Sequence, residues 1–268
     1  MPTKIQWCDE TINPLQDVIK GKSGRGYHCT KIRDGCKNCY AEVINKRFGN
    51  GLPFDNTKHE FELVQKELGK PFKWKKPIKI FVQSMGDVFH EEVPDEFRDK
   101  VFAMMALNPQ HTFIILTKRP KIACKYLTND KDFDSAANLL YDKYIKSLSE
   151  PLFLMGEIML PINNLWLGVS VSTQKDADEM IPILLQIPAS KRIVSVEPQL
   201  ENISINAYLQ RIDGIFCGCE SGQNRRHVDI DCIRNLRDQC NFAGIPFFLK
   251  QMEINGKVVH MPELGGLT

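Results

Sequence analysis

The stretch LWLGVSV at Leu165–Val171 is apolar over most of its length on both faces, which predicts a buried β-strand. Segments with helical spacing and charged faces lie at 94–107, 173–185 and 231–243. Strands that alternate with helices predict the α/β class, with mostly parallel strands and right-handed crossovers. The other apolar runs that set this alternation are IKIFVQ (78–83), TFIIL (112–116), RIVSV (192–196), GIFC (214–217) and PFFL (246–249).

Polar side chains appear where nearly every predicted strand ends. Parallel strands end at one face, which is where barrel and doubly wound enzymes build active sites. For any single residue the alternative is that solvent simply begins there, but the recurrence favours a shared site and a partial or full (βα) barrel. The side chains concerned are Ser84 and Asp87; Thr117, Lys118 and Arg119; Ser170 and Ser172; Glu197; Glu220 and Ser221; Lys250 and Gln251.

Length and composition indicate one domain. The chain has 268 residues, 43% of them hydrophobic and 25% charged, which suits one sizeable core and excludes a disordered chain. We therefore expect a single barrel domain over 1–268, with an elaborated crossover at about 121–164. No apolar run has the length of a signal peptide or a membrane span, so we expect a cytoplasmic protein without membrane contacts.

The charge balance excludes a chain whose overall field attracts nucleic acid, because 35 Lys and Arg oppose 33 Asp and Glu. A local basic run nevertheless lies at 70–76, where lysines alternate with Phe72 and Trp74. Such a run can track a nucleic-acid backbone and stack bases. More often it is a solvated face whose aromatic side chains turn inward.

Three of the nine cysteines form a cluster in YHCTKIRDGCKNCYAE (27–42), with the spacing C-x6-C-x2-C. Cys29, Cys36 and Cys39 could bind zinc with His28 or Cys8 as fourth ligand, could lack a metal, or could hold a [4Fe-4S] cluster with one iron open. The open iron is what a catalytic centre needs. We interpret the other six, Cys8, Cys124, Cys217, Cys219, Cys232 and Cys240, mainly as packing residues.

This cysteine loop, with Thr11, Asn13 and Pro14 before it and Tyr40 and Ala41 after it, resembles the cluster loop of the radical SAM superfamily. The first cysteine gap is six residues instead of three, and the glycine-rich segment is reduced to SMGD (84–87). Nearly the whole chain more closely resembles a phage- and bacterium-associated family related to that superfamily. The motifs are FVQSMGDVFHEEVP (81–94), ILTKRP (115–120), LWLGVSV (165–171), SVEP (195–198), CGCESG (217–222) and PFFLKQ (246–251).

The resemblance implies an iron-sulfur enzyme that uses S-adenosylmethionine for radical chemistry, in a partial or full barrel of radical SAM type. Cys29, Cys36 and Cys39 would then hold the cluster in a cluster-binding loop at about 13–41, and a flavodoxin- or ferredoxin-type protein would supply electrons. Ser84 and Asp87 would bind the methionine ammonium, while Ser170 and Ser172 would bind its carboxylate or the ribose.

Lys118, Glu197 and Glu220 remain as candidate catalytic residues, with Arg119 and Lys250 beside them. The cations suit a substrate that carries phosphate or carboxylate, although Lys118, Glu197, Glu220 and Lys250 could instead form one ion-pair network. His90 could be an acid/base or a cap of the next helix. We expect a nucleobase or nucleic-acid substrate. The alternative is a zinc-stabilised nucleic-acid-binding or adaptor protein without catalysis.

Overall fold

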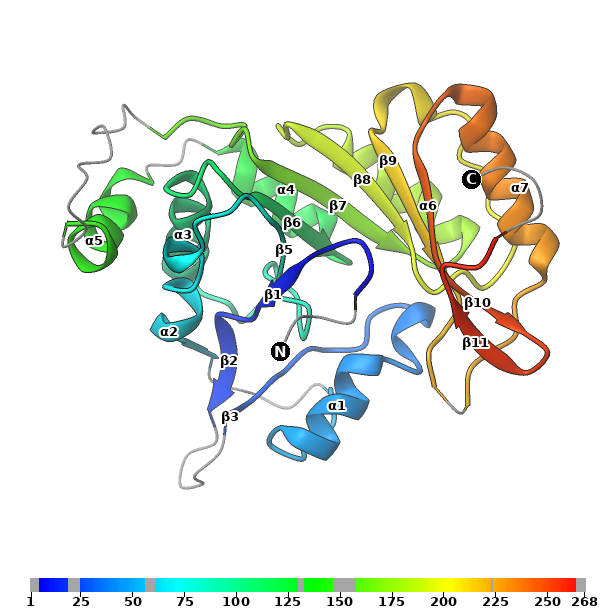
Figure 1. The fold of residues 1–268 in the computed structure, drawn as a ribbon, viewed down its shortest axis with the longest axis horizontal. Helices are drawn as coiled ribbons and strands as arrows, with labels where there is room; N and C mark the ends of the chain where they lie inside the picture. Colours follow the sequence, from blue (N-terminus) through cyan, green and yellow to red (C-terminus); the bar gives the residue numbers. More distant parts are fainter. Residues whose placement is uncertain are drawn as a thin grey trace.

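A curled, eight-stranded sheet forms the centre of the fold (Figure 1). The computed structural model describes residues 5–18, 25–55, 61–129, 133–146, 158–222 and 224–263. Seven strands are parallel, and the last is antiparallel to its neighbour. The strands in spatial order are β1 (Glu10–Ile12), β5 (Lys79–Val82), β6 (Thr112–Thr117), β7 (Leu165–Val171), β8 (Lys191–Val196), β9 (Gly214–Gly218), β10 (Phe247–Ile254) and β11 (Lys257–His260).

The described strands do not close into a ring, because β1 and β11 are the two edges of the sheet. The structure is therefore an open half-barrel of the α/β class. This confirms the predicted class and the mostly parallel strands, with the partial form of the barrel.

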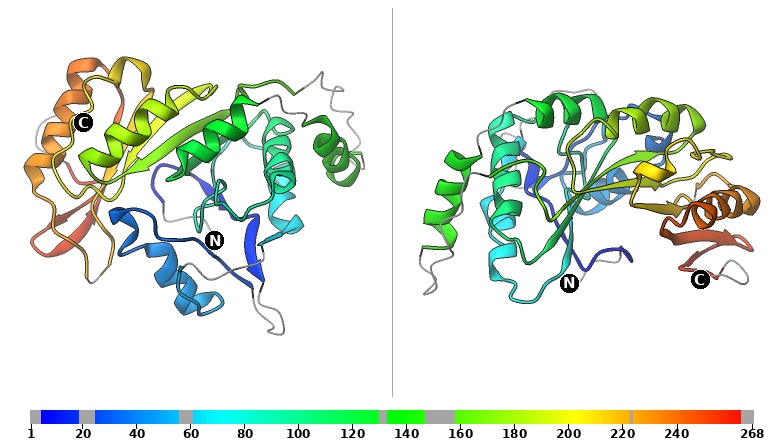
Figure 2. Two further views of the ribbon diagram at one scale, coloured as in Figure 1. Left: turned by 180° about the vertical axis from the view of Figure 1, so that it is seen from behind. Right: turned by 90° about the horizontal axis from the view of Figure 1, so that it is seen from above.

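Helices cover the outside of the curve, while α1 (Tyr40–Phe48) lies across its open side (Figures 1 and 2). The three helices expected from sequence are α3 (Asp95–Ala106), α6 (Gln174–Leu184) and α7 (Ile230–Ala243). The remaining helices are α2 (Gln65–Leu68), α4 (Pro120–Thr128), α5 (Asp134–Tyr144) and three single 3-10 turns, η1 (Asp34–Cys36), η2 (Pro71–Lys73) and η3 (Leu209–Arg211).

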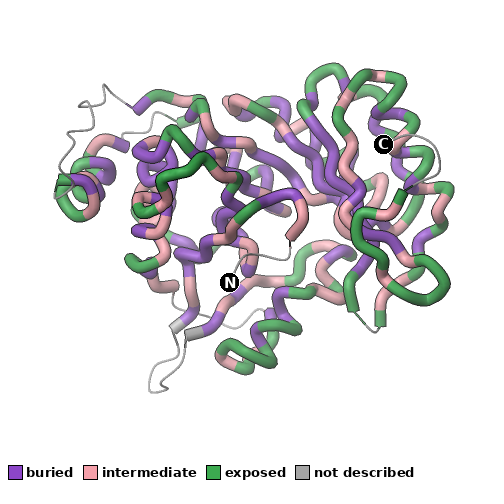
Figure 3. The backbone as a smooth tube through the Cα atoms, in the orientation of Figure 1, coloured by how far each residue is buried: buried purple, intermediate pink, exposed green. Residues whose placement is uncertain are grey.

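Alternate side chains of the strands pack on opposite faces of the sheet, as the two-residue period of a strand requires. One set of side chains packs into the large core beneath the outer helices. Figure 3 shows that the buried residues lie mainly along the strands. The other set faces inward, where Trp7 stacks on Phe216 at a ring-centroid distance of 4.8 Å and packs against Phe81. Trp7 and its aromatic neighbours therefore occupy part of the inside of the curve.

Two structural features were not expected from the sequence. A small antiparallel sheet has the order β3 (Arg25–Gly26), β2 (Leu15–Val18) and β4 (Phe61–Leu63). The β10–β11 hairpin turns through Asn255 and Gly256, which both have positive φ, and Asn-Gly is the pair that such a turn favours.

The predicted crossover at 121–164 contains α4 and the extra helix α5, which packs on α3. Its residues 147–157 lie outside the described part. In the basic run, Phe72 stacks on Tyr144 and Trp74 lies edge-on to His111, so both aromatic side chains turn inward. In the described part of the chain, no helix combines the length and the apolar character that crossing a membrane requires.

Candidate functional site

A cavity lies at the carboxyl ends of β5 to β10, where the sequence predicted a shared site. Residues in or directly after six different strands line it together with the cysteine loop. Ser172 is the exception, because it is fully buried and does not line the cavity. The predicted residues on the cavity wall are Cys29, Cys36, Cys39, Ser84, Asp87, Lys118, Arg119, Ser170, Glu197, Glu220 and Lys250.

The three cysteines come from one short loop that runs from β3 to α1. Cys36 ends the turn η1, and Cys39 is the residue immediately before the first turn of α1. Burial, opposed by Arg119 and assisted by Asp87, Cys39 and Cys36, raises the pKa of the Cys29 thiol to about 12. Burial also raises the pKa of Cys39. The thiols are thus close enough to interact, and Cys29 and Cys39 need compensating positive charge to ionise.

The described side chains contain one compact set of potential metal ligands that is separate from the three cysteines. Within the described ranges, this set of three His, Cys, Asp or Glu side chains has ligand atoms that all lie within 4.8 Å of one another, and it contains no cysteine. The choice between a zinc site and an iron-sulfur cluster at the three cysteines therefore stays a prediction.

Gly35 allows the cysteine loop to lie directly on the end of β7. A Cβ atom on Gly35 would stand 2.1 Å from Ser172 Oγ and 3.5 Å from Lys118 Nζ. Ser172 is fully buried, so its side chain has no space to move away. The predicted role of Ser172 in ligand binding has no support from its position, which is beneath the loop.

We expect Gly35→Ala to displace the cysteine loop and to reduce metal uptake by the chain at least about tenfold, because the overlap is with a buried side chain. The measurement is metal bound per chain after reconstitution. The double variant Gly35→Ala/Ser172→Gly should recover most of the uptake, since it removes the colliding atoms. Normal uptake by Gly35→Ala alone would contradict the close approach.

Asp87 and Arg119 form a buried ion pair beside Cys29. Asp87 Oδ2 lies 3.3 Å from Arg119 Nη1, and their side chains are only 6% and 3% exposed. The Asp87 carboxylate also accepts hydrogen bonds from the hydroxyl of Thr117 and from the backbone N–H groups of Lys118 and Phe89. Asp87 therefore organises the turn after β6. Because its carboxylate oxygens already accept these hydrogen bonds, its position does not favour the predicted role as partner of a ligand ammonium.

Lys250 and Glu197 form a second, separate pair on the opposite side of the mouth. Lys250 Nζ lies 2.6 Å from Glu197 Oε2, and Trp7 Nε1 donates to the other oxygen at 3.3 Å. The register of β10 shifts at Lys250, and such a bulge redirects a side chain. Lys118 instead donates to the backbone oxygen and hydroxyl of Ser170, at 3.0 and 2.7 Å.

Glu220 belongs to neither the Asp87–Arg119 pair nor the Lys250–Glu197 pair. It holds the cysteine loop in place, and we call its contacts the clamp. Its carboxylate accepts hydrogen bonds from Asn38 Nδ2 at 2.8 Å and from the backbone N–H and guanidinium of Arg226. Arg226 also donates to the backbone oxygen of Asp34 at 2.9 Å. The expected single network of Lys118, Glu197, Glu220 and Lys250 is therefore divided into three sets of contacts, and a catalytic role for Glu220 stays a prediction.

The clamp should depend on pH. Burial by itself would raise the pKa of the Glu220 carboxyl, but hydrogen bonds from Arg226 and Asn38 outweigh burial and hold the pKa below its usual value. The charged form therefore adds stability above the unfolded-state pKa of about 4.3, and this contribution is lost as pH falls through the lower folded-state pKa.

We expect Glu220→Gln to lower the free energy of unfolding at pH 7 by about 1.5 kcal/mol, the lower range for hydrogen bonds to a charged group. Urea unfolding of wild type and variant at several pH values measures the difference. It should shrink below about pH 4 as the wild-type carboxyl becomes protonated. A difference that is independent of pH would contradict the clamp.

Ser84 and Tyr40 join the cysteine loop to the turn after β5. The Tyr40 hydroxyl donates to the backbone oxygen of Ser84, and Asn13 exchanges hydrogen bonds with the Ser84 hydroxyl and the N–H of Met85. Gln83, just before this turn, has a positive φ of 63° and bonds through its side chain to both backbone groups of Leu15. These contacts hold Ser84 at the cavity.

A family model matches residues 2–261, and the family is described as "Protein of unknown function (DUF5131)". The chain belongs to the DUF5131 family. No curated protein and no solved structure matches it.

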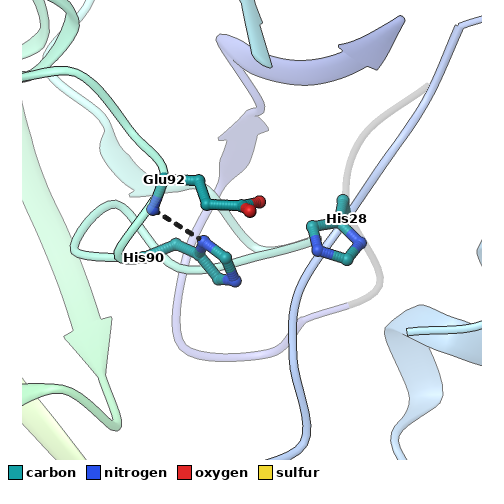
Figure 4. Close-up of side chains that lie close together, drawn as sticks. All are labelled: His28, His90 and Glu92. Carbon is teal, nitrogen blue, oxygen red and sulfur yellow. Dashed lines mark hydrogen bonds between the residues drawn. The ribbon is translucent and has the colours of Figure 1, made fainter. Parts of the chain in front are cut away.

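In this DUF5131 chain, His28, His90 and Glu92 form the set whose ligand atoms all lie within 4.8 Å (Figure 4). His90 Nδ1 accepts the backbone N–H of Glu92 at 3.2 Å, and its Nε2 lies 3.3 Å from Thr30 Oγ1. Because both ring nitrogens of His90 have partners within the chain, we interpret the set as a structural contact and not as a metal site. His90 does not cap α3, which begins at Asp95, and neither His28 nor Cys8 lines the cavity with the cysteines.

Sequence reasoning missed the residues that hold the DUF5131 cysteine loop in place. Neither Asn38 nor Arg226 was among the candidate residues. The loop also reaches α6 through Arg33, which pairs with Asp176 at 3.3 Å and with Glu179 at 2.5 Å. Such partners could have been found only from the folded chain.

Proposed function

We propose that the chain is an iron-sulfur enzyme in which Cys29, Cys36 and Cys39 hold a [4Fe-4S] cluster and which uses S-adenosylmethionine. The observation that carries the proposal is that three thiols from one loop converge on a cavity at the carboxyl ends of parallel strands. This edge is where α/β enzymes carry their reacting groups.

The donor set suits a cluster with one open iron. Iron-sulfur clusters take cysteine thiolates, each on a different iron, and three thiols of one loop line the cavity. The thiols must lose their protons to bind, although burial raises the pKa of Cys29 and Cys39. Arg119 acts against burial at Cys29, and Lys118 does so at Cys39. Two successive cations after β6 therefore supply the charge that the thiolates need.

When bound, such a cluster leaves one iron open to S-adenosylmethionine and supplies the electron for radical chemistry. The residues of the chain would bind and orient S-adenosylmethionine and would shield it from water. Trp7, Phe54 and Phe81 give the cavity apolar walls that exclude water. Ser84 and Ser170 are the hydroxyls that we propose for S-adenosylmethionine, because both line the cavity and Ser172 does not.

We propose a nucleobase or nucleic acid as substrate. A second cavity adjoins the first along α1, and Lys37 and Arg47 are among the residues that line it. Exposed cations beside a cavity suit phosphate groups. On the opposite wall, the Lys250–Glu197 pair would orient the substrate through its ammonium and carboxylate. An external flavodoxin- or ferredoxin-type donor and a cytoplasmic location complete the proposal, since thiols persist under reducing conditions.

Anaerobic reconstitution with iron, sulfide, a reductant and S-adenosylmethionine tests the proposal. We expect brown protein with broad visible absorbance, about four irons per chain, and release of 5′-deoxyadenosine. The iron content decides the cluster, and the nucleoside decides the use of S-adenosylmethionine. Colourless protein with one zinc per chain would overturn the proposal in favour of a zinc-stabilised nucleic-acid-binding or adaptor protein.

A further inference from the structure

The geometry points to Arg119 as a positioning residue that sets the reduction potential of the cluster, an inference that rests on the proposed function. Arg119 Nη1 lies 3.7 Å from Cys29 Sγ, within the range of an N–H···S hydrogen bond. Cys29 is the first of the three proposed ligands along the chain. A donor at its sulfur therefore acts on the cluster through that ligand.

The guanidinium of Arg119 is fixed by partners on three sides. Its Nε donates to Glu91 Oε2 at 2.7 Å, its Nη1 faces Asp87 at 3.3 Å, and its Nη2 donates to Thr30 Oγ1 at 2.5 Å. The side chain is only 3% exposed. A buried, immobile cation acts on a neighbouring charge with less screening than a solvated one.

The position of Arg119 makes it a net positive influence on Cys29 despite the acidic partners. Asp87 is held on the far side of the pair by Thr117 and the backbone of the turn after β6. Arg119 Nη1 is the charged donor that faces the Cys29 sulfur, at 3.7 Å. The arginine is therefore the cation through which this side of the site acts on the sulfur.

Reduction adds one electron to a cluster, so a cation and a hydrogen-bond donor at a ligand sulfur favour the reduced form. Arg119 should make the potential less negative. Its exposed partner Glu91, 54% exposed at the side chain, should have the opposite effect, because it neutralises part of the guanidinium charge.

The test is the midpoint potential of the reconstituted protein, followed by electron paramagnetic resonance during a redox titration. We expect Arg119→Gln to shift the potential to more negative values and Glu91→Gln to shift it to less negative values. Arg119→Lys keeps the charge without the forked hydrogen bonds, so its potential should fall between those of wild type and Arg119→Gln. General loosening of the site would not produce shifts of opposite sign.

Equal potentials in wild type and Arg119→Gln, or shifts of the same sign in Arg119→Gln and Glu91→Gln, would overturn the inference while leaving the proposed function intact. Wild-type protein that binds no iron would reject both. Should Arg119→Gln fail to retain a cluster, Glu91→Gln and Arg119→Lys decide: an unchanged potential in both overturns the role of Arg119.

Discussion

Cys36→Ala should lose the bound iron and the visible absorbance completely while the chain stays folded. Three thiolates are already one fewer than a closed four-cysteine set, so the loss of one leaves too few ligands. Cys36 is half buried and belongs to none of the hydrophobic clusters in the described structure. Its removal therefore costs little packing. Iron per chain, the absorbance spectrum and far-ultraviolet circular dichroism measure the result.

The matched control is Cys232→Ala, which removes an equally half-buried thiol from α7. It should keep full iron content. A Cys36→Ala chain that retained its iron would show that Cys36 is not a ligand. If it instead lost bound zinc and much of its stability, the loop would be a structural zinc site, whose binding energy contributes to folding.

Asp87→Ala should destabilise the chain by about 3–5 kcal/mol, the cost of leaving one partner of a buried ion pair without the other. Asp87 and Arg119 are both almost wholly enclosed, and the turn after β6 loses the acceptor of Thr117 and Lys118 as well. Chemical denaturation at neutral pH measures the change in the free energy of unfolding.

Asp142→Ala provides the comparison, because Asp142 pairs with Lys146 on the surface of α5 with 64% of its side chain exposed. Removing this exposed pair should cost at most about 0.5 kcal/mol. A cost below about 1 kcal/mol for Asp87→Ala would mean that water or another donor compensates Arg119, contrary to the enclosure seen here.

The central sheet was predictable because its strands are buried on both faces, as in LWLGVSV at Leu165–Val171, and such runs are distinctive. The small sheet was not, because β2 and β4 have three or four residues and include Asp17 and Glu62. Their pairing follows from tertiary contacts. The Asn255–Gly256 turn did carry a sequence signal, which indicates the β10–β11 hairpin.

The composition of the cavity was also predictable, since polar residues after parallel strands must meet at one edge. The partner of each residue was not. Lys118, Glu197, Glu220 and Lys250 suggested one network, yet Lys250 pairs with Glu197 while Lys118 meets Ser170 and Glu220 meets Asn38. Side-chain direction depends on local turns and on the bulge at Lys250. Contacts such as Arg119 with Cys29 join residues 90 apart, beyond the reach of any local pattern.

The contacts that hold the cysteine loop also fix the order of events during synthesis. Asn38 meets a residue 182 positions later, and Asp34 meets one 192 positions later. The three thiols leave the ribosome early, long before Glu220 and Arg226 exist. Until those residues arrive, the loop lacks its clamp, so if the chain has the function proposed above, we expect its cluster to be loaded only after the whole sheet has been synthesised.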